Sequence, residues 1–147
     1  MMGKWLVFSF AVLFMGCAGN RPTTLGVKDG KFIPCPASPN CVSSQSEQPS
    51  HAIEPLNYKG SLDDARTHLL EVILSMKRLK LVTQQERYIH AEFTSALFRF
   101  VDDTEFYIDD DRKIVHVRSA ARLGYSDFGV NRKRIETIRK LFNFATP

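Results

Sequence analysis

Residues 79–118 read LKLVTQQERYIHAEFTSALFRFVDDTEFYIDDDRKIVHVR. Apolar and polar side chains alternate through much of this stretch, which is the pattern of β-strands that bury one face. It predicts strands at 79–84, 88–94, 96–101, 105–109 and 114–118, with a hairpin turn at 109–113. Consecutive strands joined by such short links indicate an antiparallel meander.

The alternation assigns the side chains of these strands to two faces of the sheet. The apolar face contains Ile89, Ala91, Phe93, Phe106, Ile108, Val115 and Val117. The opposite, polar face contains Glu92, Arg99, Glu105, Tyr107, His116 and Arg118. We expect the apolar face to be covered by helices.

Two segments have the three- and four-residue apolar spacing of amphipathic helices. The first has apolar residues at 62, 65, 69, 73 and 76, with Ser61 as its cap and Asp63 and Asp64 in its first turn. The second starts near Asn131 as its cap and has apolar residues at 135, 138, 141 and 142. The expected fold class is therefore α+β, an antiparallel β-meander sheet with two helices packed on one face.

The second helix begins with Arg132-Lys133-Arg134. Three positive charges are unfavourable there, because the N-terminus is the positive end of the helix dipole. Two interpretations are open. Carboxylates of the chain, at 102, 103, 127 and 136, offset the repulsion in an internal network, or the helix amides and arginines bind an external anion.

The N-terminus has the composition of a secretory signal peptide. A positive charge at Lys4 is followed by an apolar run at 6–14 and by small residues at 16–19. The apolar stretch 5–18 is shorter than the roughly 20 residues that a membrane-spanning helix needs, so export is favoured over a permanent span.

Residues 13–17, LFMGC, resemble a bacterial lipobox. The resemblance predicts that Cys17 becomes the lipidated, palmitate-bearing N-terminus of the mature chain. Ala18 follows it instead of Asp, which by similarity to Gram-negative lipoproteins favours the periplasmic side of the outer membrane. The alternative is ordinary signal-peptidase cleavage after Ala18, which would remove Cys17.

The remaining cysteines, Cys35 and Cys41, form an even pair in an exported chain and predict one disulfide. Turn-forming residues at 36–40 can bring the two ends together. A redox-active pair or a metal site is the alternative, but catalytic dithiols and zinc ligands usually have closer spacing. The predicted organisation is a signal peptide with the lipobox cysteine at 1–17, a flexible tether at 18–31 and one domain at 32–147.

The net charge, the spacing of the histidines and the sequence around the serines argue against several functions. The 20 basic and 16 acidic side chains give a net charge of +4, which is too modest to indicate nucleic acid as a partner. The four histidines, at 51, 68, 90 and 116, are widely separated, so we expect no metal site and no cofactor. Serines occur near histidines in the sequence, but no Gly-x-Ser-x-Gly elbow accompanies them, and we assign no catalytic residue.

Four blocks together resemble the DUF1499 family of bacterial envelopes and plant plastids. They are CPASPNCVSSQ at 35–45, YIHAEFTS at 88–95, FRFVDD at 98–103, and VRSAARLGYSD at 117–127 together with Asn131, Arg132, Arg134, Ile135 and Glu136. The resemblance extends over about 26–142. Ala121 replaces a serine that the family pattern tends to have, which weakens the case for that serine as a nucleophile.

The resemblance gives the family's residues no roles, because the family name records an unknown function. Together with the arginine-bearing face it selects the candidate ligand-binding residues Glu92, Arg99, Asp102, Asp103, Arg118, Arg122, Tyr125, Asp127, Asn131 and Arg132. We predict a non-catalytic module that binds an anionic small molecule or an envelope protein, with the membrane as a partner through Cys17. The alternative is an envelope hydrolase that uses carboxylates and His116.

Overall fold

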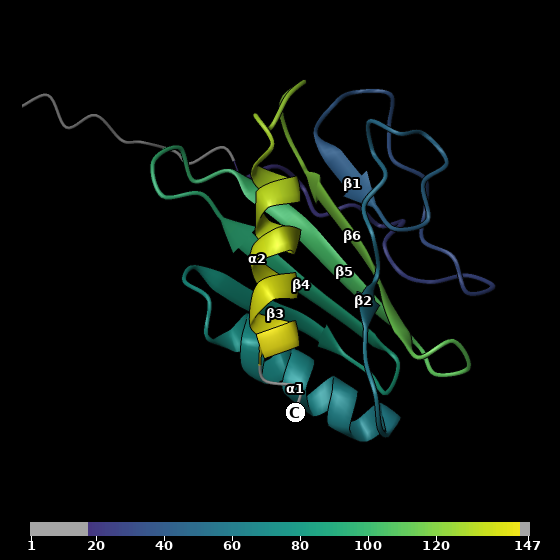
Figure 1. Cartoon of the computed structure of the whole chain (residues 1–147). Coiled ribbons are helices and arrows are strands. Elements are labelled where there is room, and N and C mark those ends of the chain that lie inside the picture. Colours follow the sequence, from purple (N-terminus) through teal and green to yellow (C-terminus); the bar gives the residue numbers. More distant parts are fainter. Residues whose placement is uncertain (1–17, 145–147) are drawn as a thin grey trace, which may run out of the picture.

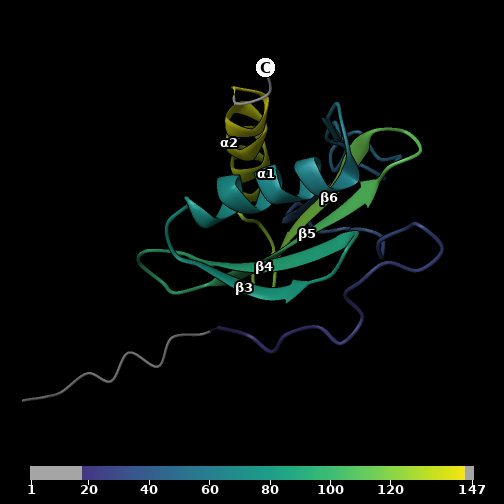
Figure 2. The same cartoon turned by 90° about the horizontal axis from the view of Figure 1, so that it is seen from below.

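A computed structural model describes residues 18–144, and the predicted signal peptide with Cys17 lies outside this range. The fold has a six-stranded antiparallel sheet and two helices, which confirms the predicted α+β class. Both helices pack on one face of the sheet, while the N-terminal segment runs along the other (Figures 1 and 2). Neither described helix is long and apolar enough to cross a bilayer.

The sheet is a meander extended at one edge by two short strands. Its strands are β1 (Cys41–Ser43), β2 (Leu56–Asn57), β3 (Leu79–Gln84), β4 (Tyr88–Thr94), β5 (Val101–Asp109) and β6 (Ile114–Ala121). The order across the sheet is β1-β6-β5-β4-β3, and β2 also pairs with β6. The two longest strands, β5 and β6, therefore lie inside the sheet and present both faces to other parts of the chain.

The prediction of a strand at 96–101 is wrong. These residues form the loop between β4 and β5, and β5 begins only at Val101. The loop closes through hydrogen bonds between Ser95 and Phe100, from Ser95 N to the Phe100 carbonyl at 2.8 Å and from Phe100 N to Ser95 Oγ at 2.9 Å. Arg99 has φ of +58°, which interrupts an extended backbone, so it does not lie on the polar face of the sheet.

Two short strands extend the sheet beside β6. One is β2, which starts at Leu56, directly after Pro55. The proline-rich loop at 32–45 contains β1, whose three residues pair with the end of β6. Strand pairing there is possible because the prolines of the loop end at Pro39, before β1 begins.

Helix α1 (Leu62–Leu74) begins as predicted, with Ser61 Oγ accepting a hydrogen bond from Asp64 N at 3.1 Å. It ends at Leu74, two residues before Met76, so the basic residues Lys77 and Arg78 lie outside the helix. Its buried side chains join those of the sheet and of helix α2 (Val130–Phe144) in one core. The largest fully buried apolar members include Phe106, Phe142, Leu69 and Ile73.

The start of α2 is capped by Asp127, not by Asn131 as predicted. The Asp127 carboxylate accepts hydrogen bonds from Gly129 N at 3.0 Å and from Asn131 N at 2.9 Å. Asn131 lies within the first turn and is fully buried. The first amides of α2 therefore donate to a carboxylate of the protein itself. This agrees with the internal network, the first of the two interpretations, and not with an external anion bound at the helix start.

Candidate functional site

The polar face of the sheet is a buried ionic layer. Strand pairing places Glu92 opposite Asp103 and places Glu105 opposite Arg118. Directly opposed residues of antiparallel strands project from the same face. The segment predicted as a flexible tether contacts this layer, with Arg21 Nε donating to Glu92 at 2.7 Å and Gly26 N donating to Glu105 at 2.7 Å.

The first part of this layer surrounds Arg122, just after β6. Its Nε and Nη2 donate to the two oxygens of Asp103, each at 2.7 Å. Nη2 also contacts Glu92, which in turn accepts from Arg21. His90 Nε2 lies 2.7 Å from Asp103 Oδ1. Arg122, Arg21 and His90 thus all contact the two carboxylates of Asp103 and Glu92.

The cluster shifts the pKa values of its acids. Burial acts to raise the pKa of Asp103, but hydrogen bonds from Arg122 and His90 lower it below its ordinary value. The pKa of Glu92 is lowered in the same way, with Arg122 and Arg21 outweighing burial. Hydrogen bonding to Asp103 raises the pKa of Arg122. Both carboxylates are therefore ionised and matched by arginines in an internal network.

The second part of the layer is the pair of Arg118 and Glu105. Arg118 Nη1 donates to Glu105 Oε2 at 3.1 Å, and Tyr88 donates its hydroxyl to Glu105 Oε1 at 2.8 Å. Burial raises the pKa of that Tyr88 hydroxyl. Arg118 is only 4% exposed, yet its Nε has no hydrogen-bond partner. Within the described part of the chain, this Nε is the only buried side-chain nitrogen or oxygen without a hydrogen-bond partner.

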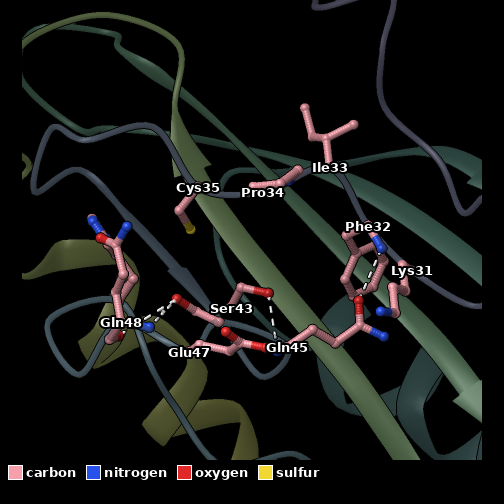
Figure 3. Close-up of a pocket in the computed structure, with 11 residues that line it drawn as sticks. Lys31, Phe32, Ile33, Pro34, Cys35, Ser43, Gln45, Glu47 and Gln48 are labelled. Atoms are coloured by element: carbon pink, nitrogen blue, oxygen red, sulfur yellow. Dashed lines mark hydrogen bonds between the residues drawn. The ribbon is translucent and has the colours of Figure 1, made fainter.

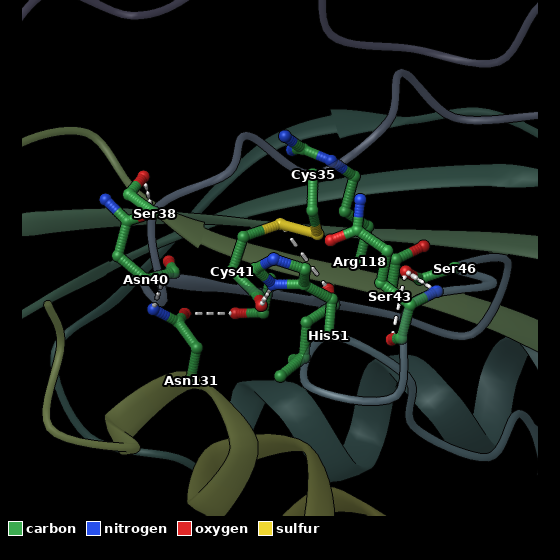
Figure 4. Close-up of a disulfide and its surroundings, with 12 residues drawn as sticks. Cys35, Ser38, Asn40, Cys41, Ser43, Ser46, His51, Arg118 and Asn131 are labelled. Carbon is green, nitrogen blue, oxygen red and sulfur yellow. Dashed lines mark hydrogen bonds between the residues drawn. A yellow bond between two sulfur atoms is a disulfide. The ribbon is translucent and has the colours of Figure 1, made fainter. Parts of the chain in front are cut away.

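The disulfide lies next to Arg118. Cys35 and Cys41 are joined as predicted, with their Cα atoms 5.7 Å apart. Strand pairing aligns Cys41 with Ala120 and Ser43 with Arg118, and Figure 4 draws Arg118 among the surroundings of the disulfide. Asn40, within the disulfide loop, donates to the Gly124 carbonyl at 2.6 Å. The loop is thus fixed to the end of β6.

A surface hollow of about 330 Å³ adjoins this region (Figure 3). Its wall includes Cys35 of the disulfide and Ser43, the strand partner of Arg118. Lys31 supplies a cationic side chain to the wall, and Glu47 supplies an acidic one. Gln45 holds the wall together, because it accepts from Phe32 N and donates to the Gly30 carbonyl. The hollow is polar and has room for a small ligand.

Three other candidate residues form a separate cluster on the helix side of the sheet. Asn131 Nδ2 donates to Asp127 at 2.8 Å, and Arg134 Nη2 donates to Asp102 at 2.6 Å. The two pairs are linked because Asn131 Oδ1 accepts from both Arg134 and Ser119. Burial raises the pKa of Asp102, although Arg134 opposes this. This cluster attaches α2 to the sheet.

The remaining candidates do not lie in either cluster. Arg132 donates to the Ala52 carbonyl at 2.8 Å and to the Ser50 carbonyl at 3.0 Å. Arg99 is exposed in the β4–β5 loop, and Tyr125 is exposed in the loop before α2. Of the ten candidates, the polar layer therefore contains Glu92, Asp103, Arg118 and Arg122.

Several residues of the layer are not among the ten predicted ligand-binding residues. The strand pattern placed Glu105 on the polar face, and Tyr88 and His90 alternate with apolar residues in the same way, so this pattern is the signal that could have selected all three. Arg21 gives no such signal, because it precedes the strands in a segment without apolar periodicity. Its role depends on how that segment crosses the sheet.

A further polar pair lies at the other end of β6. Ser44 Oγ and His116 Nδ1 are 3.1 Å apart, and His116 Nε2 lies 3.9 Å from Asp109 Oδ2. Ser44 Oγ also accepts from Val117 N at 2.9 Å. Burial lowers the pKa of His116. Within residues 18–144, no three or more His, Cys, Asp or Glu side chains are grouped so as to hold a metal ion.

The fold and its buried ionic layer define an α+β domain with one arginine-rich, disulfide-bordered face. A family model described as "Protein of unknown function (DUF1499)" matches residues 31–142. The chain belongs to this family, as its sequence blocks predicted. A comparison with curated proteins gives no match.

Proposed function

We propose that this DUF1499 protein is an envelope lipoprotein, anchored through Cys17 on the periplasmic side of the outer membrane. Its domain acts as a non-catalytic module that binds an anionic ligand or an envelope partner. Two features of the sequence support the location. They are the lipobox-like stretch ending at Cys17 and a disulfide pair, Cys35 and Cys41, of the kind that persists in oxidising compartments.

The unpartnered Nε of Arg118 is the observation that carries the binding proposal. A buried donor on a charged group costs about 1–3 kcal/mol or more when it has no acceptor. Native proteins avoid this cost almost everywhere, so we expect a water, ion or ligand to bind a buried donor of this kind. A ligand oxygen that accepts from Nε would complete the hydrogen bonding of Arg118.

The chemistry of Arg118 favours an oxyanion as that ligand. A guanidinium presents parallel donors that match a carboxylate or a phosphate, and such charge-assisted hydrogen bonds are stronger than neutral ones. Arg122 does not offer its Nε in the same way, because Asp103 accepts from that Nε, and Asp103 and Glu92 both accept from its Nη2. Lys31 in the adjoining hollow adds a second cation. The expected ligand is therefore a small molecule or peptide end bearing a carboxylate or phosphate.

Native mass spectrometry of the purified mature protein tests this proposal. Removing Arg118 alone would leave Glu105 charged and unpaired, so the variant is Arg118→Met together with Glu105→Gln. The glutamine oxygen can still accept from Tyr88 and Gly26, which keeps the fold. Glu105→Gln alone is the control that retains Arg118.

We expect the wild type and the Glu105→Gln variant to carry an added mass from a co-purifying anionic ligand, and the double variant to carry none. An equal mass on all three proteins, or no adduct on any of them after incubation with phosphate and acetate, would refute Arg118 as the site. Metabolic labelling with radioactive palmitate tests the anchor separately. Label should enter the wild type and be absent from Cys17→Ser.

The second candidate is an envelope hydrolase, favoured by the contact between Ser44 and His116. A neutral histidine within hydrogen-bond reach of a serine hydroxyl is the start of a nucleophilic site. Burial lowers the pKa of His116, which keeps it neutral and able to accept a proton. Ser44 also lines a hollow with Arg132 and Glu136.

A fluorophosphonate probe decides between the two candidates. A hydrolase should be labelled at Ser44, and both Ser44→Ala and His116→Ala should abolish the labelling while the protein stays folded. The binding module should not be labelled at Ser44. In that case the Ser44 hydroxyl joins Val117 N to His116 as a structural bridge.

A further inference from the structure

One end of the sheet carries large apolar side chains that are exposed to solvent. They lie on the β4–β5 loop at 95–100 and on the β6–α2 loop at 122–129. We call this set the apolar tip. It consists of Leu97 (78% exposed), Phe98 (64%), Phe100 (41%), Leu123 (41%), Tyr125 (76%) and Phe128 (94%). Large apolar side chains that gather on neighbouring loops and stay exposed indicate an interaction site.

Strand pairing places the two loops at the same end of the molecule. Thr94 pairs with Val101 at the base of the first loop, and Asp102 pairs with Ala121 at the base of the second. The loops are joined directly, because Arg122 N donates to the Val101 carbonyl at 3.1 Å. Figure 1 shows both loops at one end of the sheet and the β5–β6 hairpin at the other.

The N-terminal end of the described chain lies at the apolar tip. Gly19 packs so closely on the β6–α2 loop that a Cβ added to it would be 3.0 Å from Leu123 Cγ. Arg21, two residues later, is held by Glu92. Cys17 precedes Gly19 by two residues, and two residues of extended chain span at most about 7 Å. A lipid attached to Cys17 therefore starts beside the apolar tip.

Basic side chains surround the apolar tip. Lys77 and Arg78 lie in the turn before β3, whose first residue pairs with Phe93 near the end of β4. Arg99 lies within the β4–β5 loop, and Lys133 lies in the first turn of α2. None of these four side chains forms an ion pair with another described residue. Their charges remain available to an anionic surface.

We propose that the apolar tip inserts into the interfacial region of the phospholipid bilayer that holds the Cys17 anchor. Aromatic and aliphatic side chains on two loops, beside basic residues, match the boundary between acyl chains and anionic headgroups. The proposal rests on the proposed lipid anchor. Anchor and tip together would hold the domain in one orientation, with the β5–β6 hairpin directed away from the membrane.

Tryptophan fluorescence in bromine-labelled vesicles tests this orientation. Trp5 is the only tryptophan of the chain, so Trp5→Phe gives a background without tryptophan. Phe98→Trp and Phe128→Trp place a probe in each loop of the apolar tip, and Asp111→Trp places the control in the exposed β5–β6 turn. Each full-length variant is expressed in bacteria, purified and reconstituted in phosphatidylethanolamine and phosphatidylglycerol with brominated acyl chains.

We expect Phe98→Trp and Phe128→Trp to lose fluorescence and to shift to shorter wavelength, while Asp111→Trp does neither. If all three probes stay unquenched in protein that carries acyl chains at Cys17 by mass spectrometry, the docking proposal is wrong and the anchor stands. If the mass shows no acyl chain, the anchor proposal fails. The same protein, mixed with the vesicles, still decides the docking: quenching at positions 98 and 128 supports it and no quenching overturns it.

Discussion

Arg122 holds Asp103 with two parallel hydrogen bonds, Nε to Oδ2 and Nη2 to Oδ1, each 2.7 Å long. The same carboxylate lies 2.7 Å from His90 Nε2. Both residues are almost completely buried, as side-chain exposures of 6% and 2% show. This geometry identifies Arg122 as a structural connector between β4, β5 and the end of β6, whereas the buried Nε of Arg118 has no acceptor among the described residues.

Arg122→Ala should strongly destabilise the domain. The variant leaves Asp103 and Glu92 buried without their main donor, and breaking a buried ion pair on one side costs about 3–5 kcal/mol. Arg122→Lys should recover only part of the loss, because an ammonium cannot bind Asp103 in the bidentate manner. Urea unfolding measures both, with exposed Arg112→Ala as the control; equal stability of all three variants and the wild type would contradict the assignment.

The same network predicts loss of stability in acid. The folded-state pKa values of Asp103 and Glu92 are lowered, so the unfolded chain takes up protons more readily than the folded one. Their contribution is fully present above their ordinary pKa of about 4 and is lost as the pH falls through the lower folded-state values. The free energy of unfolding should therefore drop below that pH. Asp103→Asn should flatten the drop, and a wild-type profile without one would show that the network does not favour the ionised acids.

Reduction of the disulfide should lower the free energy of unfolding by about 2 kcal/mol, because the bridge closes a short loop. Urea titrations with and without dithiothreitol measure the difference. The matched control is Cys35→Ser with Cys41→Ser, which should be equally destabilised and insensitive to the reductant. Incorporation of two alkyl labels into unreduced folded protein would show that the bridge is absent.

Asp127→Ala should destabilise the start of α2 by about 1–2 kcal/mol, since the carboxylate caps the helix and accepts from the Asn131 side chain. Asp127→Asn keeps an oxygen at the cap and should lose less. Thermal unfolding followed by circular dichroism compares the two variants. Equal losses would show that the charge of Asp127, and not its capping oxygen, supports the helix.

The strand pattern predicted much of the fold because burial and exposure alternate through β4, β5 and β6. It failed at 96–101, where Phe98 and Phe100 have strand-like spacing but lie exposed in a loop. The two phenylalanines flank Arg99 with the spacing of a strand, yet no element of residues 18–144 covers them. Spacing reports which residues alternate, and it does not report whether a partner element exists to bury them.

The candidate site was predicted less completely than the fold. Glu92, Asp103, Arg118 and Arg122 come together because strand register aligns them, and register depends on where each strand begins. Asp102 differs from Asp103 by one position and therefore projects to the opposite side, toward Arg134. The contribution of Arg21 depends on a contact across 71 positions of the chain, which no local pattern encodes.

NMR of the arginine Nε–H groups can show whether the buried Nε of Arg118 donates to an oxyanion. The Arg118 signal is assigned by its disappearance in the Arg118→Met, Glu105→Gln variant, and inorganic phosphate or acetate is then titrated into isotope-labelled protein. We predict that this signal moves downfield as an oxyanion accepts from it, while the signal of Arg122, already bound to Asp103, stays in place. An Arg118 signal that does not respond to either anion, or that moves no more than the others, would show that Arg118 is not the anion-binding residue.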